Sequence, residues 1–416
     1  MLSNADPKIW QLIEGEKKRQ KFGLELIPSE NYTSKAVLEA NGSILTNKYS
    51  EGYPRKRYYG GQEFIDQVEE LAQQRLLKLF KLSPKTWHAN VQPYSGSPAN
   101  MAVYFALVPL GETIMGQKLV EGGHLTHGHK VNFSGKAYNA VQYSLDPKTG
   151  RLNYTEIAKL AKKYKPKLII SGATAYPRKI DFSQFGRIAK SVGAFHLADI
   201  SHIAGLIVGG QHPSPFAYAD VVMTTTHKTL RGPRSAVIMC HKELAPMIDK
   251  AVFPGLQGGP HEHTIAAKAV CFAEAMQPRF RSYAKQIVKN AAKLATELNK
   301  MGYELVTGGT DNHLILVDLT NKNLTGQQAQ TVLDEVGITV NKNTVPSEPR
   351  SPFDPSGIRL GTPALTSRGM KEHEMTLIAD LLDQTLKNTE SPKELKKIRQ
   401  RVTALAKRFP IPGVDS

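Results

Sequence analysis

One lysine stands at the exit of a β-branched strand, beside a histidine and shortly before two arginines. Residues 220–226 are rich in valine and threonine, which favours a strand in the sheet of an α/β domain. Lys228 follows that strand, with His227 next to it and Arg231 and Arg234 beyond it. Burial and nearby cations lower the pKa of a lysine, which frees its amine to attack a carbonyl. Lys228 is therefore a Schiff-base candidate, and the alternative is a solvated loop lysine.

The segment 92–100 has the composition of a helix start that could hold a phosphate. Ser95, Gly96 and Ser97 lie where this helix would begin, and Pro98 lies in its first turn. Free backbone N–H groups and the positive end of the helix dipole attract anions there. The signal is weak by itself, since most capped helices bind nothing. The sequence contains neither a Walker A motif nor G-x-G-x-x-G, which disfavours nucleoside triphosphates and dinucleotides.

Asp199 directly follows the short apolar run 195–198, which has the pattern of a strand. The carboxyl end of such a strand in an α/β protein delivers side chains to the ligand crevice. A carboxylate placed there can keep the ring nitrogen of pyridoxal phosphate protonated, which makes the ring an electron sink. The same residue could instead cap the end of the strand, and the pattern does not separate these two roles.

Three histidines, His124, His127 and His129, lie close together in the sequence and suggest a metal site. No cysteine lies nearby, and Glu121 is the only adjacent acid. The glycines before His124 suit a close approach of the backbone to a flat ligand. We therefore expect no metal and interpret His124 as a residue that stacks on a ring.

Arg359 lies in the apolar and glycine-rich segment 356–363, where an unpaired guanidinium would be costly to bury. A carboxylate bound through two parallel hydrogen bonds would offset that cost. This carboxylate could belong to an internal aspartate or to an amino-acid substrate.

The composition fits an enzyme of two domains. The 416 residues exceed the size at which a single hydrophobic core stops growing, and no apolar stretch is long enough to span a bilayer. The two cysteines, Cys240 and Cys271, are too few and too far apart for a disulfide framework. The first residues lack the organisation of a signal or transit peptide, so we expect a cytoplasmic protein.

The chain is strongly basic. Its 54 Lys and Arg residues against 37 Asp and Glu residues give a net charge of +17. Such a charge attracts anionic ligands and permits nonspecific contact with RNA. No zinc-finger, RNP-type or arginine-rich module stands out, so a nucleic acid is not expected as the primary partner. No membrane partner is expected either.

Alternating strand and helix signals up to about residue 275 predict an α/β fold with a mainly parallel sheet covered by helices. We assign residues 1–275 to an N-terminal arm plus a large ligand-binding domain, and residues 276–416 to a smaller α/β domain. The loop 48–61 is polar yet rich in tyrosine, which is typical of a site or an interface. Periodic apolar residues predict helices at 5–21, from 63 onward, at 182–191, at 287–298 and at 395–405.

Four stretches carry a resemblance to a known family: residues 26–31, 46–61, 91–104 and 224–234. Together with the lysine, the phosphate cup, the aspartate and the arginine, they make the chain resemble pyridoxal-phosphate enzymes of the aspartate-aminotransferase type, which is fold type I. More narrowly, residues 26–368 resemble the serine hydroxymethyltransferase family. This resemblance implies a pyridoxal phosphate cofactor and reversible transfer of the serine hydroxymethyl group to tetrahydrofolate, which gives glycine and methylenetetrahydrofolate. It also implies a homodimer with shared active sites, and it leaves a tetramer open.

The resemblance further implies a role for individual residues of this chain. The catalytic residues would be Lys228, His227, Glu51 and Tyr59. The cofactor ligands would be Ser95, Gly96, Ser97, His124, Thr174, Asp199, His202, Thr225, Lys228 and Arg234, with Tyr49, Gly258 and Gly259 from the neighbouring subunit. The substrate residues would be Ser29 and Arg359 for the serine carboxylate, Glu51 and Tyr59 from the partner chain, and Leu119, Leu125 and Asn343 for the folate. The set includes no metal ligand.

Five positions depart from the family pattern, namely Pro28, Arg55, Thr174, Met223 and Ser235. Arg55 and Ser235 stand where glycine is usual, so their side chains restrict the backbone. Thr174 keeps a hydroxyl and Met223 lies several residues before the lysine. We therefore expect neither to change the chemistry.

Two other functions are weighed against the transferase. A folate-independent aldolase of threonine-like amino acids would share the lysine, the aspartate and the arginine, but it would need neither Glu51 nor Asn343. A basic RNA-binding or scaffolding protein that kept an enzyme fold would have no use for Lys228, Asp199 and Arg359. The presence of all five residues favours the transferase.

Overall fold

The computed structural model describes residues 1–415 as two compact units. The larger unit comprises residues 36–285, and the smaller unit combines residues 1–35 with the chain from residue 286 onward. The boundary between them falls within helix α12 (Pro278–Lys300).

This division differs from the expected one, in which residues 1–275 form one domain and residues 276–416 the other. The N-terminal arm belongs to the smaller unit, because Leu24 and Leu26 are fully buried in that unit's hydrophobic core. A short amphipathic arm carries no signal in its own sequence for which of two cores it joins, since that choice depends on contacts distant in the chain.

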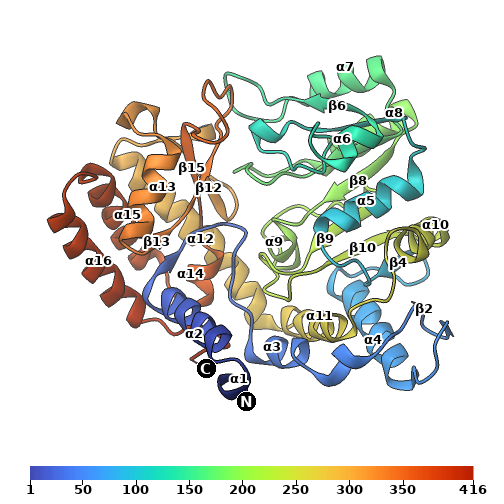
Figure 1. Cartoon of the computed structure of the whole chain (residues 1–416). Coiled ribbons are helices and arrows are strands. Elements are labelled where there is room, and N and C mark those ends of the chain that lie inside the picture. The colour runs from blue at the N-terminus through green and yellow to red at the C-terminus, as the bar shows by residue number, and fades with distance from the viewer. Residues whose placement is uncertain (416) are drawn as a thin grey trace. The chain divides into compact units, whose positions relative to one another are not determined.

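A sheet of seven strands lies at the centre of the larger unit, within the described residues (Figure 1). Its strand order is β4-β10-β9-β8-β7-β5-β6. The strands are β4 (Trp87–Asn90), β5 (Thr113–Gln117), β6 (Asn139–Tyr143), β7 (Leu168–Ser171), β8 (Phe195–Asp199), β9 (Val221–Thr225) and β10 (Ala236–His241). Strand β10 is antiparallel to both of its neighbours, and the other pairs are parallel. The mainly parallel sheet expected from the sequence is therefore confirmed.

Helices cover both faces of this sheet. Leu197 shares a buried apolar cluster with helix α5 (Gly96–Leu107) on one face. Its neighbour His196 points to the opposite face, where its ring lies 5.9 Å from that of Phe185 in α8 (Phe182–Val192). Other helices of this unit are α3 (Lys35–Asn41), η1 (Ile44–Asn47), α4 (Glu63–Leu79), η2 (Leu119–Glu121), α6 (Phe133–Ala137), α7 (Tyr154–Tyr164), α9 (Ala204–Val208), η3 (Lys242–Leu244), α10 (Ala245–Lys250), the π-helical η4 (Ala251–Leu256) and α11 (Glu262–Ala275).

The parallel strands bring predicted site residues to one edge of the sheet. Strands β5, β7, β8 and β9 run in the same direction, so their carboxyl ends share an edge. Strand β8 ends at Asp199, and β9 ends at Thr225, shortly before Lys228. The segment after β5 carries His124, and the segment after β7 carries Thr174.

The smaller unit is built on an antiparallel sheet of order β11-β12-β15-β14. Strand β1 (Leu24–Glu25) from the N-terminal arm pairs in parallel with β13 (Ile338–Thr339). The strands of the antiparallel sheet are β11 (Glu304–Leu305), β12 (Leu314–Asp318), β14 (Asn341–Asn343) and β15 (Gly357–Gly361). The helices include α1 (Leu2–Ala5), α2 (Pro7–Phe22), η5 (Val306–Gly308), η6 (Thr320–Lys322), α13 (Gly326–Glu335), α14 (Pro363–Ser367), α15 (Glu372–Lys387) and α16 (Pro392–Lys407).

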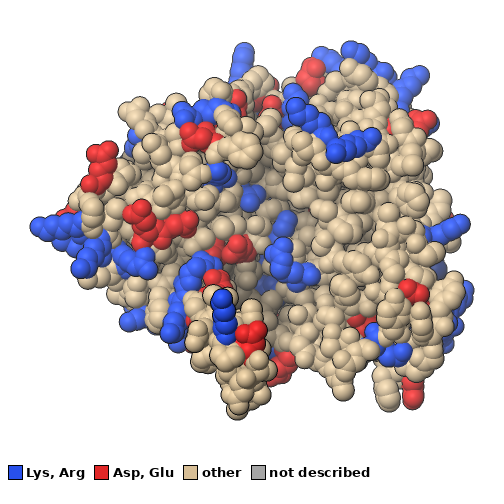
Figure 2. Space-filling model, viewed as in Figure 1, with Lys and Arg blue, Asp and Glu red and all other residues tan. Residues whose placement is uncertain are grey.

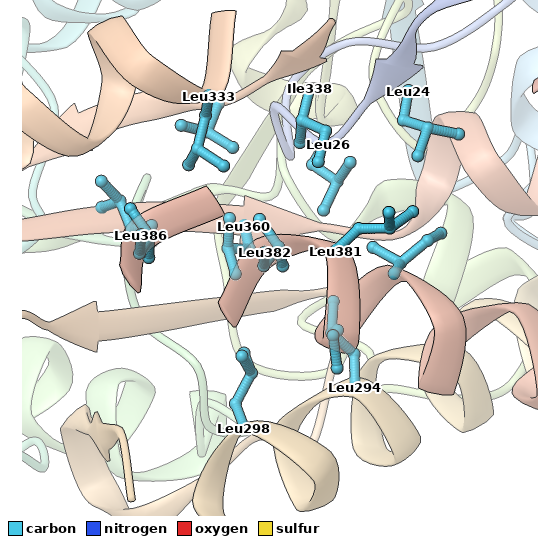
Figure 3. Packing of buried hydrophobic residues seen from close by; sticks show 14 of the residues in the cluster. Leu24, Leu26, Leu294, Leu298, Leu333, Ile338, Leu360, Leu381, Leu382 and Leu386 are labelled. Atoms are coloured by element: carbon cyan, nitrogen blue, oxygen red, sulfur yellow. The ribbon is translucent and has the colours of Figure 1, made fainter. Parts of the chain in front are cut away.

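Figure 3 shows how the N-terminal arm enters the core of the smaller unit. Leu24 and Leu26 lie in the same cluster as Leu294 of α12, Leu360 of β15 and Leu381 of α15. Residues from the two ends of the chain therefore share one hydrophobic core, and removal of either end would expose it.

The helices expected from periodicity are confirmed. They correspond to α2, α4, α8, α12 and α16, with ends that differ by at most three residues where both were predicted, except that α12 begins nine residues before residue 287. Gly193 ends α8 in the left-handed conformation with φ 70°, as its position after the helix suggested.

The surface agrees with the basic composition. Figure 2 shows lysine and arginine side chains dispersed over the visible face, with acidic side chains between them. Within the described residues, no helix combines the length and the apolar composition needed to cross a membrane.

A close backbone contact fixes the N-terminal arm against β15. The N–H of Gly361 donates to the carbonyl of Leu26 at 2.7 Å, and a Cβ at Gly361 would lie 2.5 Å from Cα of Pro28. Pro28 therefore packs where only a glycine fits opposite it.

We predict that Gly361→Ala destabilises the fold by about 1–3 kcal/mol, because the added methyl forces the arm away from β15. The midpoint of urea unfolding measures this effect. Gly15→Ala in α2 is the matched control, since no described atom lies within 4 Å of its Cβ and alanine favours a helix. Equal midpoints for Gly361→Ala and the wild type would contradict the prediction.

Candidate active site

A cavity opens at the carboxyl edge of the larger sheet. The lining comes entirely from the larger unit and consists of Gly96, Asn100, His124, His127, Ala173, Thr174, Asp199, Ser201, His202, Met223, Thr225 and Lys228. The structure therefore brings together the predicted residues Gly96, His124, Thr174, Asp199, His202, Thr225 and Lys228.

Asp199 carries a buried negative charge in this cavity and is only 9% exposed. Its Oδ2 accepts a hydrogen bond from Nδ2 of Asn100 at 3.0 Å and lies 3.2 Å from Nε2 of His127. Its Oδ1 accepts the backbone N–H of Ser201 at 3.1 Å. These three partners satisfy the carboxylate and hold it in one orientation.

The environment keeps Asp199 ionised. Burial raises its pKa, because burial penalises the charged form. The hydrogen bond and charge of His127, together with the hydrogen bond from Ser201, outweigh burial and hold the pKa of Asp199 well below its ordinary value. The side chain is therefore a carboxylate at neutral pH.

His124 presents a neutral ring to the cavity. Its Nδ1 lies 2.7 Å from Oγ1 of Thr126 and accepts the N–H of Thr126 at 3.2 Å. Asn100 holds Thr126 in turn, through an Nδ2 to Oγ1 hydrogen bond of 2.9 Å. Burial, and then the charge of His127, lower the pKa of His124 to about 4. A neutral, oriented imidazole of this kind can stack on a flat ligand.

Helix α5 begins at Gly96 with Ser95 as its N-cap residue, so the helix start predicted from the sequence is confirmed. Among the described residues, the Ser95 side chain makes no capping hydrogen bond to the helix. A side chain at position 96 would not fit, since a Cβ on Gly96 would lie 2.8 Å from Cγ2 of Thr225. The first turn therefore offers backbone N–H groups that a phosphate can approach closely.

The loop that carries Lys228 is fixed by its own polar groups. Thr226 donates from Oγ1 to the carbonyl of Pro233 at 2.6 Å, and the N–H of Gly232 donates to the carbonyl of Thr226 at 2.8 Å. Burial first, and then the charges of Arg234 and Lys228, lower the pKa of His227 to about 3. His227 is consequently neutral beside the lysine at neutral pH.

A second cluster gathers the residues that the family resemblance assigns to the neighbouring subunit's site. Tyr49 donates to Oε1 of Glu51 at 3.3 Å, and its ring lies 4.9 Å from that of Tyr59. A Cβ on Gly258 would lie 3.4 Å from Glu51 Oε1, and a Cβ on Gly259 would lie 3.6 Å from the Tyr49 ring. In the described structure, none of these five residues lines the cavity of its own chain.

Three predicted residues, Ser29, Arg359 and Asn343, belong to the smaller unit. Arg359 pairs with Asn341 across β15 and β14, and its Nε donates to Asn341 Oδ1 at 3.2 Å. Burial lowers the pKa of Arg359 to about 10. Asn343 lies on β14, and Ser29 follows the arm segment that packs on β15. Arg359 lies on β15, Asn343 lies opposite Gly357 of the same strand, and Ser29 directly follows Pro28, which lies close to Gly361 of that strand.

The remaining predicted residues lie outside the cavity lining of the described structure, and they are Ser95, Ser97, Leu119, Leu125, His227 and Arg234. Leu119, in η2, and Leu125 both belong to the segment after β5. Leu125 is 41% exposed.

Sequence reasoning missed Asn100, His127 and Ser201, the three residues that position Asp199. Asn100 had a signal, because it is polar on the face of α5 that is otherwise apolar and buried. His127 was noticed only as one of three histidines. No group of three or more histidine, cysteine or acidic side chains in residues 1–415 is placed to hold a metal ion.

The departures from the family pattern have distinct structural outcomes. Arg55 adopts φ 64°, a conformation that glycine adopts more easily, and its guanidinium pairs with Glu70 at 2.9 Å. Ser235 is buried and donates to the carbonyl of Pro93 at 2.9 Å. Thr174 donates to the carbonyl of Gly123 at 2.7 Å. Met223, although distant from the lysine in sequence, lines the cavity.

A comparison with protein families bears on the identity of this site. The family model for serine hydroxymethyltransferase matches residues 2–382. The chain belongs to the serine hydroxymethyltransferase family. It is accordingly a pyridoxal-phosphate-dependent transferase of fold type I that interconverts serine and glycine and uses tetrahydrofolate as co-substrate. Nothing in the comparison favours the aldolase alternative.

The residues of the cavity fit the cofactor that serine hydroxymethyltransferases use. The cavity offers a lysine, an ionised carboxylate, a neutral flat ring and a helix start that admits no side chain at Gly96. Each corresponds to one part of pyridoxal phosphate, namely its aldehyde, its ring nitrogen, its ring face and its phosphate.

The lowered pKa of His124 predicts a pH dependence of stability. In the unfolded chain the imidazole titrates near 6.5, whereas in the folded protein its pKa is about 4. Between these values the unfolded state binds the extra proton, so stability is full above pH 6.5 and declines as the pH falls toward 4.

His124→Phe removes this titration, so the wild type is expected to lose on the order of 1–3 kcal/mol more than the variant between pH 7 and pH 4. Urea unfolding at both pH values gives the difference, in which the contributions of other histidines cancel. Parallel losses in the two proteins would show that His124 does not titrate as described.

Proposed function

We propose that Lys228 carries pyridoxal phosphate in this serine hydroxymethyltransferase, and that Asp199, His124 and the start of α5 position the cofactor. The observation that carries the assignment is the buried, ionised Asp199 in the same cavity as Lys228. A carboxylate with a strongly perturbed pKa, in a cavity that also contains a lysine, is typical of a functional site.

The geometry supports a separate task for each residue. Pyridoxal phosphate, when bound, supplies an electron-poor ring that takes up the electrons released when the Cα–Cβ bond of serine breaks. Asp199 would hold a proton on the ring nitrogen, because its own pKa is far too low for it to take that proton. Neutral His124 would cover the ring face, and the N–H groups around Gly96 would bind the phosphate.

We assign the serine carboxylate to Arg359 and Ser29 of the smaller unit. Burial disfavours the charged guanidinium of Arg359, so an incoming carboxylate would gain from pairing with it. The neighbouring Asn341 holds Nε of Arg359 and leaves the guanidinium in a defined orientation. Asn343 on the adjacent strand, together with Leu119 and Leu125, is assigned to the folate.

We assign proton transfer to Glu51 and positioning of the substrate to Tyr59. A carboxylate next to the serine hydroxyl and the folate can move the proton that must leave one and reach the other. Tyr49 donates to Glu51 and so orients its carboxylate.

These two residues would act in the site of a partner subunit, so we propose a homodimer. The cluster of Tyr49, Glu51 and Tyr59 does not line the cavity of its own chain in the described residues. Large apolar side chains near these residues in the sequence are strongly exposed: Ile44 by 79%, Tyr58 by 75% and Phe64 by 69%. Exposed apolar side chains of this kind are typical of a surface that another protein covers.

We further propose that the enzyme works in the cytoplasm. Both of its cysteines, Cys240 and Cys271, are buried and free. Free cysteines fit a reducing compartment.

Lys228→Ala is expected to abolish the visible absorbance band of the reconstituted protein, because the covalent link to the cofactor cannot form. Borohydride treatment of the wild type should fix the cofactor to the peptide that contains Lys228, which mass spectrometry can locate. Fixation on another lysine would refute the assignment.

Mixing two inactive variants tests the shared site. Glu51→Gln should keep the absorbance band but lose folate-dependent turnover, and Lys228→Ala should lose both. Each mixed dimer would contain one site with intact Lys228 and Glu51, so random exchange should restore about a quarter of wild-type activity. In the control, Lys228→Ala is mixed with Glu70→Gln in place of Glu51→Gln. No recovery despite confirmed exchange of subunits would exclude a shared site.

A further inference from the structure

The backbone that leads into the phosphate cup is held by side chains at three successive carbonyls. The carbonyl of Val91 accepts from Nζ of Lys268, that of Gln92 accepts from Nε2 of Gln257 at 3.0 Å, and that of Pro93 accepts from Ser235 at 2.9 Å. This segment is therefore tied to the elements that carry these side chains, so that its displacements are shared with them.

The side chain of Gln92 connects this segment to the hairpin of β2 (Gly52–Tyr53) and β3 (Lys56–Arg57). Its Nε2 donates to the carbonyl of Gly52 at 2.9 Å and to Oε1 of Glu69 at 2.9 Å. Gln92 is 2% exposed and Glu69 is fully buried, so water does not compete for these bonds.

Arg57 completes the connection from the hairpin side. Its guanidinium donates to Glu69 Oε2 at 2.8 Å and to the carbonyls of Ser50 and Gly52 at 2.9 and 3.0 Å. The two carbonyls flank Glu51 in the sequence. The backbone on both sides of the proposed proton-transfer residue is thus tied to the same buried network as Gln92.

A second branch runs in parallel. Ser50 donates from Oγ to Oε1 of Glu262 at 2.6 Å, and Glu262 lies on α11 with Lys268. Burial raises the pKa of Glu262 to about 7 and lowers the pKa of Lys268 to about 7. The pKa of each of these two groups depends on the charge of the other and on the charge of Glu69.

We infer that Gln92 is a positioning residue that couples the phosphate cup to the loop bearing Tyr49, Glu51 and Tyr59. Occupation of the cup fixes the segment at Ser95 and Gly96, and Gln92 transmits that order to Gly52 and Arg57. This inference rests on the proposed function, since that function places the cofactor phosphate at the start of α5. In the proposed dimer, the cofactor of one subunit thereby orders the loop that the same subunit contributes to its partner's site.

Hydrogen exchange of the apo and reconstituted proteins tests this coupling. Pyridoxal phosphate should slow exchange in peptides that cover residues 50–58 of the wild type by roughly 5- to 150-fold, the usual range of coupling between two sites. Gln92→Met keeps the volume of the side chain and removes its hydrogen bonds to Gly52 and Glu69. In this variant the cofactor should still bind, but protection of the hairpin should be lost.

The control is Tyr53→Phe, which removes the part-buried hydrogen bonds of the same hairpin to the carbonyl of Asp249 and from Nδ2 of Asn90, and leaves the side-chain hydrogen bonds of Gln92 in place. Cofactor-induced protection should persist in this control. Protection that survives in Gln92→Met, or that is absent from every protein although the cofactor binds, overturns the inference. Failure of the wild type to bind pyridoxal phosphate would instead overturn the proposed function. Should Gln92→Met not fold, Gln92→Asn, which shortens the reach of the amide, takes its place.

Discussion

The site depends on one buried charge. The carboxylate of Asp199 stands at the buried end of strand β8, where an ionised group is stable only if the surrounding structure supplies donors in fixed positions. Asn100 on α5, His127 after β5 and the N–H of Ser201 supply them. These partners come from three different parts of the larger unit, so the order of strands and the placement of α5 both serve this carboxylate. The neutral ring of His124 is held by the same Asn100 through Thr126.

Much of this arrangement could be predicted from the sequence. Strand patterns that end at Asp199 and shortly before Lys228 indicated a common edge, because parallel strands of an α/β sheet share their carboxyl ends. The helix start at Ser95 and Gly96 was equally clear from its capping residues. Family resemblance then supplied roles that no local pattern carries, such as those of Glu51 and Arg359.

The rest could not be predicted, because it depends on contacts between segments distant in the sequence. Asn100 and His127 meet Asp199 only after α5 and the segment behind β5 are packed on the sheet, so the sequence did not show that either residue contacts Asp199. The position of Met223 on the cavity wall follows from the direction of its side chain in β9, not from its distance to Lys228 along the chain. The N-terminal arm joined an unexpected core for the same reason.

The interleaved order of the two units has a consequence for how the protein is made. Residues 36–285 are continuous, so the larger unit can begin to fold while the ribosome is still adding residues. The arm that contains Leu24 and Leu26 must wait, with its leucines uncovered, until β15 and α15 have been synthesised. The apolar segment around Leu24 and Leu26 therefore stays exposed in the nascent chain through most of translation. Chaperones can bind it during that period.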